Sequence, residues 1–479
     1  MFFAISAPLR EIFKNKCIEY MAFLLYNTIM LIAKIALGLV GLGVVVFVHE
    51  LGHFLMAHLA GIDVEAFSIG WGNPILKKKI KNVEYRLGMF PVGGYCKLRG
   101  DNEFKEAWEN NASGIEPVKG TFYGASPWGR MLTAFGGPLF NVLFAVLVLS
   151  CIWGIGFEVQ TLDNRIVLAS EFDSNASYPA DDAGFKTGDR IIEVNGRKTQ
   201  YFHEVQENIA VNPDRLLPVT VEREGLTLNL FVRPNLDKST GAGKIGVYFW
   251  SDPLIADLIP DSDAAIAGLL PGDRIIRVNG QDINNTIDIM KAVEHGSGIA
   301  EFDIIRDGAE SSVNIVLSQS ENTALGIVWP RLQFKTPVLS PPAALVKGAS
   351  ESWKSLVLSL RSLSLLFKGI ELTEAVSGPV RITYMVGDIA AEGFGRSFGA
   401  GLRSMADFLA LISIALCVMN LLPLPVLDGG LIILSAVELI RRKPIHPKAI
   451  KVFQTAGVVI IFGLMLFAVF GDILYLTRR

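Results

Sequence analysis

The stretch that decides the fold is residues 35–53, IALGLVGLGVVVFVHELGH, in which an uncharged apolar run leads directly into two histidines and a glutamate. Ionisable side chains at membrane depth are costly, so such a group implies a functional partner. On a helix, residues four positions apart lie about 40° apart in projection, so His49 and His53 face one point where a zinc ion can sit. Glu50 can then reach the metal-bound water as a general base. The stretch therefore predicts a membrane-spanning helix that carries a metal site.

The composition places the whole chain in the membrane class. Of its 479 residues, 51% are hydrophobic and only 19% are charged, which is too apolar for a soluble enzyme of this size. The formal net charge of -3 gives no indication of nucleic-acid binding. The four cysteines are scattered without C-x-x-C spacing, so any metal must be held by histidines and carboxylates.

The apolar residues are concentrated in segments long enough to span a bilayer. These segments are residues 24–48, 131–155, 405–427 and 452–470. Residues 343–367 are interrupted by charges, while their apolar residues recur at helical spacing. That pattern predicts a helix lying along the membrane surface and not a fifth span.

The distribution of basic residues predicts the orientation of the four spans. Residues 71–130 carry ten Lys and Arg, and residues 441–451 carry five with no acidic residue, so both loops are expected to be cytoplasmic. With four crossings, both termini and the polar central insert then lie outside the cytoplasm. The active site is expected to open towards the cytoplasm, at the end of the first span.

The central insert contains an internal repeat. Residues 183–196 read AGFKTGDRIIEVNG and residues 267–280 read AGLLPGDRIIRVNG, which match at ten of fourteen positions with an offset of 84 residues. In each copy a Gly-Asp turn leads into a short β-branched strand that an Asn-Gly turn closes. The pattern resembles PDZ domains, which bind extended peptides by adding a strand to a sheet edge. The alternative is that the pair acts only as a spacer or size filter.

A catalytic zinc needs a third protein ligand, and Asp428 is the best candidate. Residues 408–427 contain no charge, and Pro423 and Pro425 should break the helix shortly before the acid. His49 and Asp428 both lie near the C-terminal ends of their spans, so these spans must run in the same direction. One crossing between them satisfies this condition. The alternative is that Asp428 only caps the next helix.

In combination, these motifs resemble the site-2 protease family of intramembrane zinc metalloproteases. The resemblance rests on residues 49–53 (HELGH), 67–72 (FSIGWG), 91–95 (PVGGY), 136–138 (GGP) with Asn141, the repeated insert, 377–379 (SGP) and 420–430 (NLLPLPVLDGG). It implies one catalytic Zn²⁺ held by residues matching His49, His53 and Asp428, with Glu50 as the base. It also implies that Asn141 and Asn420 help to handle the substrate.

A membrane-spanning substrate presents a difficulty, because its helix hides the scissile carbonyl and uses every backbone donor internally. The substrate must be unwound locally, and its backbone then needs new partners. Residues 84–98, which include the turn at Gly93 and Gly94 and the following Tyr95, could supply a strand edge for this pairing. The family resemblance implies a membrane-associated β-hairpin at the same place. The alternative is an ordinary cytoplasmic hairpin.

The predicted fold is an α-helical polytopic membrane protein with four transmembrane helices and an inserted tandem of mainly β PDZ domains. The expected parts are an N-terminal extension (1–27), a first membrane half (28–157), PDZ domains (158–240 and 241–332), an interfacial helical segment (333–402) and a second membrane half (403–479).

The predicted function is intramembrane proteolysis in a bacterial inner membrane, with the PDZ domains periplasmic. The resemblance implies single-span membrane substrates of the anti-sigma-factor type and signal-peptide remnants. Peptide ligands of the PDZ domains and the lipid bilayer are the other expected partners. The alternative function is a non-catalytic membrane scaffold, which would not need Glu50, the two histidines or Asp428.

Overall fold

The structure is a computed structural model. It describes residues 7–173, 177–238, 240–294, 298–317, 325–365 and 378–477. Contacts divide the described chain into a helical unit, formed mainly by residues up to Ile155 and from Val338 onward, and an inserted unit, Gly156–Pro337. One inserted unit therefore interrupts the helical unit, and each unit is described by itself below.

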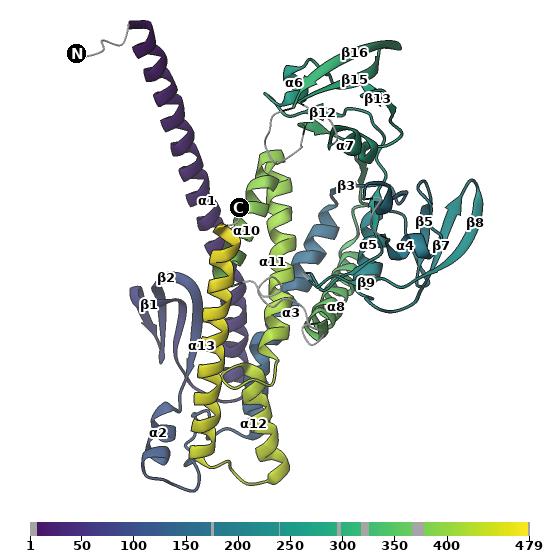
Figure 1. Ribbon diagram of the computed structural model, residues 1–479. Helices are drawn as coiled ribbons and strands as arrows, with labels where there is room; N and C mark the ends of the chain where they lie inside the picture. The colour runs from purple at the N-terminus through teal and green to yellow at the C-terminus, as the bar shows by residue number, and fades with distance from the viewer. Residues whose placement is uncertain are drawn as a thin grey trace. The chain divides into compact units, whose positions relative to one another are not determined.

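Four helices of the helical unit are long and apolar enough to cross a membrane (Figure 1). They are Thr28–Leu59 within α1 (Ala7–Leu59), α3 (Pro127–Ile155), α11 (Phe398–Asn420) and Pro447–Leu474 within α13 (Pro447–Thr477). Many of their large apolar side chains are exposed, among them Val40, Leu147 and Val459, as expected for surfaces that face lipid. The Ser-Gly-Pro motif begins at Ser377, which lies outside the described residues.

The third span ends earlier than its composition predicts. Helix α11 ends at Asn420, whereas the apolar run continues to Leu427. Pro423 and Pro425 explain the difference, because proline lacks a backbone N–H and disfavours helical geometry in the residue before it. The chain turns through these prolines and starts α12 (Asp428–Arg441) at the candidate ligand.

Two further helices accompany the spans. Helix α8 (Pro341–Leu365) is not among the candidate spans; its Gly348 faces Ser150 of α3, and its Glu351 pairs with Lys347 and Lys354. Helix α10 (Pro379–Arg396) packs against α1 and α11.

Charged groups hold the middle and the start of α10. Asp388 pairs with Lys34 of α1 at 2.5 Å. The buried carboxylate of Asp472, on α13, accepts hydrogen bonds from the backbone N–H groups of Gly378, Val380 and Arg381 at 2.8–3.1 Å. Asp472 thus occupies the place of a helix cap, where an anion stabilises the free N–H groups of the first turn. The sequence analysis did not identify this packing.

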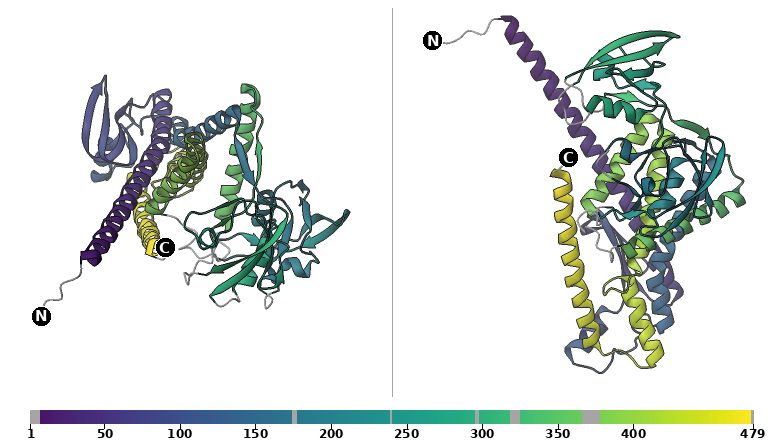
Figure 2. Two further views of the ribbon diagram at one scale, coloured as in Figure 1. Left: turned by 90° about the horizontal axis from the view of Figure 1, so that it is seen from above. Right: turned by 45° about the vertical axis from the view of Figure 1, so that its right-hand side comes forward.

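A folded-back hairpin lies beside α1 (Figures 1 and 2). Strands β1 (Val64–Ile80) and β2 (Val83–Leu98) pair antiparallel, and α2 (Asp101–Glu109) follows them. Residues 66–69 of β1 pair with residues 84–87 of β2 on one side and with residues 94–97 on the other. Both strands therefore bend back, and the last part of β2 becomes an edge of the sheet.

The inserted unit contains two four-stranded sheets with the same strand order, β6-β5-β7-β8 and β14-β13-β15-β16. The first copy consists of β5 (Arg190–Val194), β6 (Arg197–Lys198), α5 (Phe202–Ala210), β7 (Leu217–Arg223) and β8 (Leu226–Val232). The second consists of β13 (Arg274–Val278), β14 (Gln281–Asp282), α7 (Thr286–Glu294), β15 (Ile299–Arg306) and β16 (Ala309–Val316). The structure thus shows the duplication that the sequence repeat predicts.

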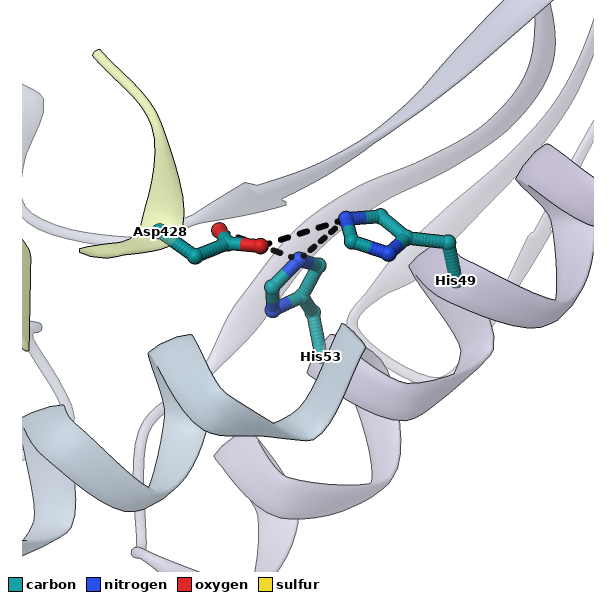
Figure 3. A group of neighbouring side chains, drawn as sticks. All are labelled: His49, His53 and Asp428. Atoms are coloured by element: carbon teal, nitrogen blue, oxygen red, sulfur yellow. Dashed lines mark hydrogen bonds and ion pairs between the residues drawn. The ribbon is translucent and has the colours of Figure 1, made fainter. Parts of the chain in front are cut away.

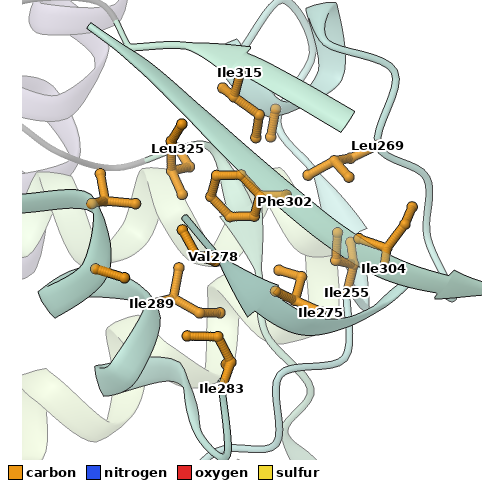
Figure 4. Close-up of a cluster of buried hydrophobic side chains, with 14 residues drawn as sticks. Ile255, Leu269, Ile275, Val278, Ile283, Ile289, Phe302, Ile304, Ile315 and Leu325 are labelled. Atoms are coloured by element: carbon orange, nitrogen blue, oxygen red, sulfur yellow. The ribbon is translucent and has the colours of Figure 1, made fainter. Parts of the chain in front are cut away.

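Each copy repeats the same local chemistry. The Asn-Gly turns have positive φ at Asn195 and Asn279, as type I′ hairpin turns require. A buried aspartate of each copy pairs at 2.7 Å with an arginine one strand away, Asp189 with Arg223 and Asp273 with Arg306. Figure 4 shows the core of the second copy, where Phe302 is completely buried among aliphatic side chains.

Short elements complete the insert. They are β3 (Glu158–Thr161), β4 (Ile166–Leu168), the 3-10 helix η1 (Ala169–Glu171), α4 (Pro179–Asp182), β9 (Asn235–Leu236), β10 (Gly243–Lys244), β11 (Val247–Phe249), β12 (Asp257–Leu258), α6 (Asp263–Ile266), β17 (Ile327–Val328) and β18 (Leu332–Lys335). Strand β3 pairs with β18, so the two ends of the insert lie side by side.

Candidate metal centre

The two histidines of the predicted motif lie one turn apart on α1, and Asp428 approaches them as the first residue of α12. The two Nε2 atoms are 3.1 Å apart. The carboxylate of Asp428 places Oδ2 3.3 Å from His49 Nε2 and Oδ1 3.4 Å from His53 Nε2. Figure 3 shows this carboxylate directed at both rings. The structure thus brings together the three side chains that the sequence analysis selected as ligands, from segments 375 residues apart.

These distances suit a zinc ion. Tetrahedral ligands about 2.0–2.1 Å from zinc lie about 3.3 Å from one another, close to the three separations observed. Asp428 Oδ2 is buried, and no group among the described residues gives it a hydrogen bond of good geometry. Two imidazoles and one carboxylate also leave a fourth position open, as catalytic zinc sites require. The donor set therefore fits the predicted metal.

Hydrogen bonds fix the orientation of the rings. His53 Nδ1 donates to the backbone oxygen of Thr133 at 2.9 Å, so the lone pair of this ring lies on Nε2. The amide nitrogen of Asn141 lies 3.1 Å from Nδ1 of His49, and the amide nitrogen of Asn420 lies 3.3 Å from Nε2 of His49. Both asparagines predicted to handle substrate thus contact a candidate ligand, and their role stays a prediction.

Glycines bring α3 close enough to make these contacts. A Cβ atom on Gly52 would collide with the backbone of Gly136, and one on Gly136 would collide with Gly52. A Cβ on Gly137 would collide with both histidine rings. The Gly-Gly-Pro motif was found only by family resemblance. Its steric reason becomes visible once α1 and α3 are packed together.

A buried ion pair holds the helix that carries Asp428. Arg130, near the start of α3, pairs with Glu438 of α12, and both side chains are about nine-tenths buried. The second oxygen of Glu438 accepts the backbone N–H of Ile445 at 3.0 Å. Removing one partner of such a pair leaves an uncompensated charge, so the pair constrains how α12 lies on α3. Its two residues are 308 positions apart, and no sequence motif linked them.

Glu50 lies in the same cavity as the candidate ligands. The cavity has a volume of about 370 Å³ and is lined by Val46, His49, Glu50, His53, Tyr95, Cys96, Leu98, Phe122, Thr133, Ala134, Leu416, Asn420, Val426, Leu427, Asp428 and Leu431. The Glu50 carboxylate hydrogen-bonds to the backbone of Cys96. Burial and the nearby charge of Glu50 raise the pKa of the Cys96 thiol to about 12, so the free thiol is protonated at neutral pH. Cys96 is not in the group of described side chains close enough to share a metal ion.

The edge formed by the end of β2 runs past this cavity. Gly94 pairs with Ile69 of β1, and its other side lies against Glu50 and Val46 of α1. Gly93 has φ of 86° and is packed against the Trp71 ring, where a side chain would collide. Tyr95 lines the cavity, and its hydroxyl accepts a hydrogen bond from Arg86 at 3.0 Å. Of the three predicted substrate residues of the hairpin, Gly94 lies against the candidate base and Tyr95 lines its cavity, whereas Gly93 contacts Trp71.

The other histidines are separate from this centre. His58 packs at a tilt against Phe54 on α1, His203 forms a hydrogen bond with Thr161 within the insert, and His446 lies directly before α13. His295 lies outside the described residues. Among the described residues, His49, His53 and Asp428 are the one group of three or more His, Cys, Asp or Glu side chains close enough to share a metal ion.

Comparison with known proteins agrees with this geometry. The sequence profile of Peptidase family M50 matches residues 37–464. A protein of Treponema pallidum named "Putative zinc metalloprotease" is 36% identical over 92% of this chain and 99% of its own length. A protein of the same name from Borreliella burgdorferi is 32% identical over 92% of this chain and 98% of its own length. The "Regulator of sigma-E protease RseP" of Escherichia coli is 27% identical over 91% of this chain and 97% of its own length.

Proposed function

Because this chain belongs to Peptidase family M50, and is thus a zinc metalloendopeptidase of the site-2 protease type, we propose that it cleaves single-span membrane proteins within their membrane-spanning segments. The observation that carries the proposal is the convergence of His49, His53 and Asp428 at the end of a candidate span, with Glu50 in the same cavity. A protease for soluble substrates has no need to place its site there.

The side chains divide the chemistry between them. His49 and His53 would hold zinc through Nε2, and Asp428 through its carboxylate. When bound, the ion supplies a Lewis acid that polarises the scissile carbonyl and makes water nucleophilic near neutral pH. Glu50 takes the proton of the attacking water on its carboxylate and delivers it to the leaving amine. Asn420, which lines the cavity beside His49, can donate its amide hydrogens to the substrate carbonyl.

The free edge at the end of β2 could bind the backbone of the unwound substrate. Successive residues of a strand direct their backbone groups to opposite edges, so residues two positions apart direct them to the same edge. Because Cys96 directs its backbone towards Glu50, Gly94 directs its own N–H and C=O to the same side. A substrate strand added here would satisfy its freed backbone groups and run past the catalytic residues.

The charge pattern and the relatives support a proposal for the membrane in which the reaction takes place and for the orientation of the chain in it. We propose a bacterial inner membrane, with the basic loops and the opening of the site on the cytoplasmic side and the inserted repeat in the periplasm. The Escherichia coli relative is named a regulator of sigma-E, which supports a regulatory reaction, and we propose a substrate of the anti-sigma-factor type. Signal-peptide remnants have the same single-span chemistry and are proposed as further substrates.

The proposed reaction is tested with the purified chain reconstituted into vesicles together with a single-span substrate. We expect cleavage within the spanning segment, loss of cleavage after removal of the metal by a chelator, and recovery when stoichiometric zinc is restored. The cut position is read by mass spectrometry of the products. Cleavage that persists in the metal-free protein, or cuts that fall only in soluble segments, would contradict the proposal.

Resemblance to the site-2 protease family suggests that the inserted repeat acts as a size filter, the alternative to peptide binding given above. Thr161 and Leu332 are paired residues of β3 and β18, so residues 162–331 can be replaced by an Asn-Gly turn that joins two adjacent strands. We expect this variant to cleave a substrate that carries a bulky folded periplasmic domain, which the intact chain rejects. A substrate without that domain serves as the control and should be cut equally by both proteins. Continued rejection of the bulky substrate would show that the repeat is not the filter.

A further inference from the structure

Asn141 occupies an unusual position behind the candidate metal centre. Its side chain is completely buried on α3, and it does not line the cavity that holds Glu50 and Asp428. Its amide nitrogen lies 3.1 Å from Nδ1 of His49, and its amide oxygen has no hydrogen-bond partner among the described residues. Its backbone oxygen accepts a hydrogen bond from Ser413 of α11 at 3.0 Å, which fixes the residue in place.

The chemistry of a ligating histidine determines what Asn141 must do. A neutral imidazole carries one proton, and the nitrogen without it is the ligand. Nε2 of His49 faces His53 and Asp428, so this nitrogen must carry the lone pair and Nδ1 must carry the proton. A ligating histidine almost always donates that proton to an acceptor. His53 has such an acceptor in the Thr133 carbonyl, whereas the group facing Nδ1 of His49 is the Asn141 amide.

We propose that Asn141 is a positioning residue that accepts the Nδ1 proton of His49 through its amide oxygen, and so fixes the tautomer in which Nε2 binds zinc. A half-turn of the amide exchanges its two atoms and places the oxygen 3.1 Å from Nδ1, where the nitrogen lies. The inference rests on the proposed function. It assigns to Asn141 a contact with the ligand instead of the contact with substrate that family resemblance implies.

The half-turn moves the Asn141 amide nitrogen to the position where the amide oxygen had no hydrogen-bond partner. A substitution that keeps the acceptor but has no N–H at that position can therefore test the proposal. Asn141→Asp presents an oxygen at both positions, so it keeps an acceptor for the Nδ1 proton and places no N–H donor where the amide oxygen has no partner. A carboxylate behind a ligating histidine also makes the ring a stronger ligand. Asn141→Leu has a similar size but no acceptor. Ser413→Ala is the matched control, because it removes the hydrogen bond to the backbone of Asn141 and leaves the amide intact.

The experiment measures the zinc dissociation constant of the full chain in detergent by competition with a chromophoric chelator, together with the melting temperature of the metal-free protein. We expect Asn141→Leu to bind zinc about 10–100-fold more weakly, and Asn141→Asp to bind at least as tightly as the unaltered chain. The zinc dissociation constant of Ser413→Ala should stay within about threefold of that of the unaltered chain. This is well below the tenfold weakening expected when a contact that supports a metal ligand is lost. Unaltered affinity in Asn141→Leu, or equal weakening in Asn141→Leu and Asn141→Asp, would overturn the assignment.

A second measurement does not depend on the folding of any variant. Nitrogen NMR of the zinc-loaded protein with ¹⁵N-labelled histidine distinguishes a protonated Nδ1 from a protonated Nε2. We expect the His49 proton on Nδ1, and a proton on Nε2 would refute the inference. Failure of the proposed function is a separate result, because the unaltered chain would then bind no zinc or would bind it without cleaving substrate.

Discussion

Glu50→Gln is expected to lower the rate of substrate cleavage by about 10²–10⁴-fold, the usual contribution of a general base. The substitution keeps the size of the side chain and its ability to accept the hydrogen bond from the backbone of Cys96, but an amide cannot take a proton from water. The measurement is single-turnover cleavage of a reconstituted single-span substrate at saturating enzyme, which separates the chemical step from binding.

Two controls make this result specific to the base. Zinc content and melting temperature of Glu50→Gln should equal those of the unaltered chain, because Glu50 is not in the ligand set. Glu106→Gln, on the exposed side of α2, removes the same charge outside the cavity and should leave cleavage unchanged. Full activity of Glu50→Gln at full zinc occupancy would exclude Glu50 as the base.

Gly137→Ala is expected to weaken zinc binding by about 100-fold or more, although alanine is the better helix former. The new methyl group would collide with Nε2 of His53 and Cε1 of His49, so either the rings turn away or α3 moves away from α1. Metal ligands tolerate errors of only about 0.2 Å, so neither adjustment preserves the site. Metal content after dialysis and the zinc dissociation constant both report this loss.

Gly129→Ala is the matched control for this substitution. It lies on the same helix, where the nearest atom to a new Cβ is 3.4 Å away, an ordinary contact distance. We therefore expect Gly129→Ala to retain zinc. If Gly137→Ala binds zinc as tightly as Gly129→Ala does, the close approach of α3 to the histidines has no functional importance.

The sequence was sufficient to predict the four candidate spans and the convergence of His49, His53 and Asp428, because both depend on local patterns. An uncharged run of adequate length can be read directly, and two histidines four residues apart must share a helix face. Asp428 was predicted because an acid after a long uncharged segment needs a partner. The end of α11 was predicted less well, because hydropathy continues through prolines that end the helix.

The features that the sequence analysis did not find depend on contacts between distant segments. Helix α10 carries Arg381, Asp388 and Glu392, so its composition gives no apolar run, and its partners on α1 and α13 are known only from the packing. The folded-back sheet depends on where β1 and β2 bend, which leaves no periodic pattern. The contact of Asn141 with His49 likewise appears only when α3 is placed against α1.

The continuity of α1 makes the depth of the active site sensitive to the thickness of the lipid. The apolar run of residues 24–48 ends directly before His49, and at about 1.5 Å per residue it is about 38 Å long, more than one hydrocarbon thickness. Because α1 is one continuous helix, we expect a thinner bilayer to tilt the whole helix and with it the two imidazoles. The bond that is cut in a given substrate should therefore shift along its sequence with the acyl-chain length of the surrounding phospholipids.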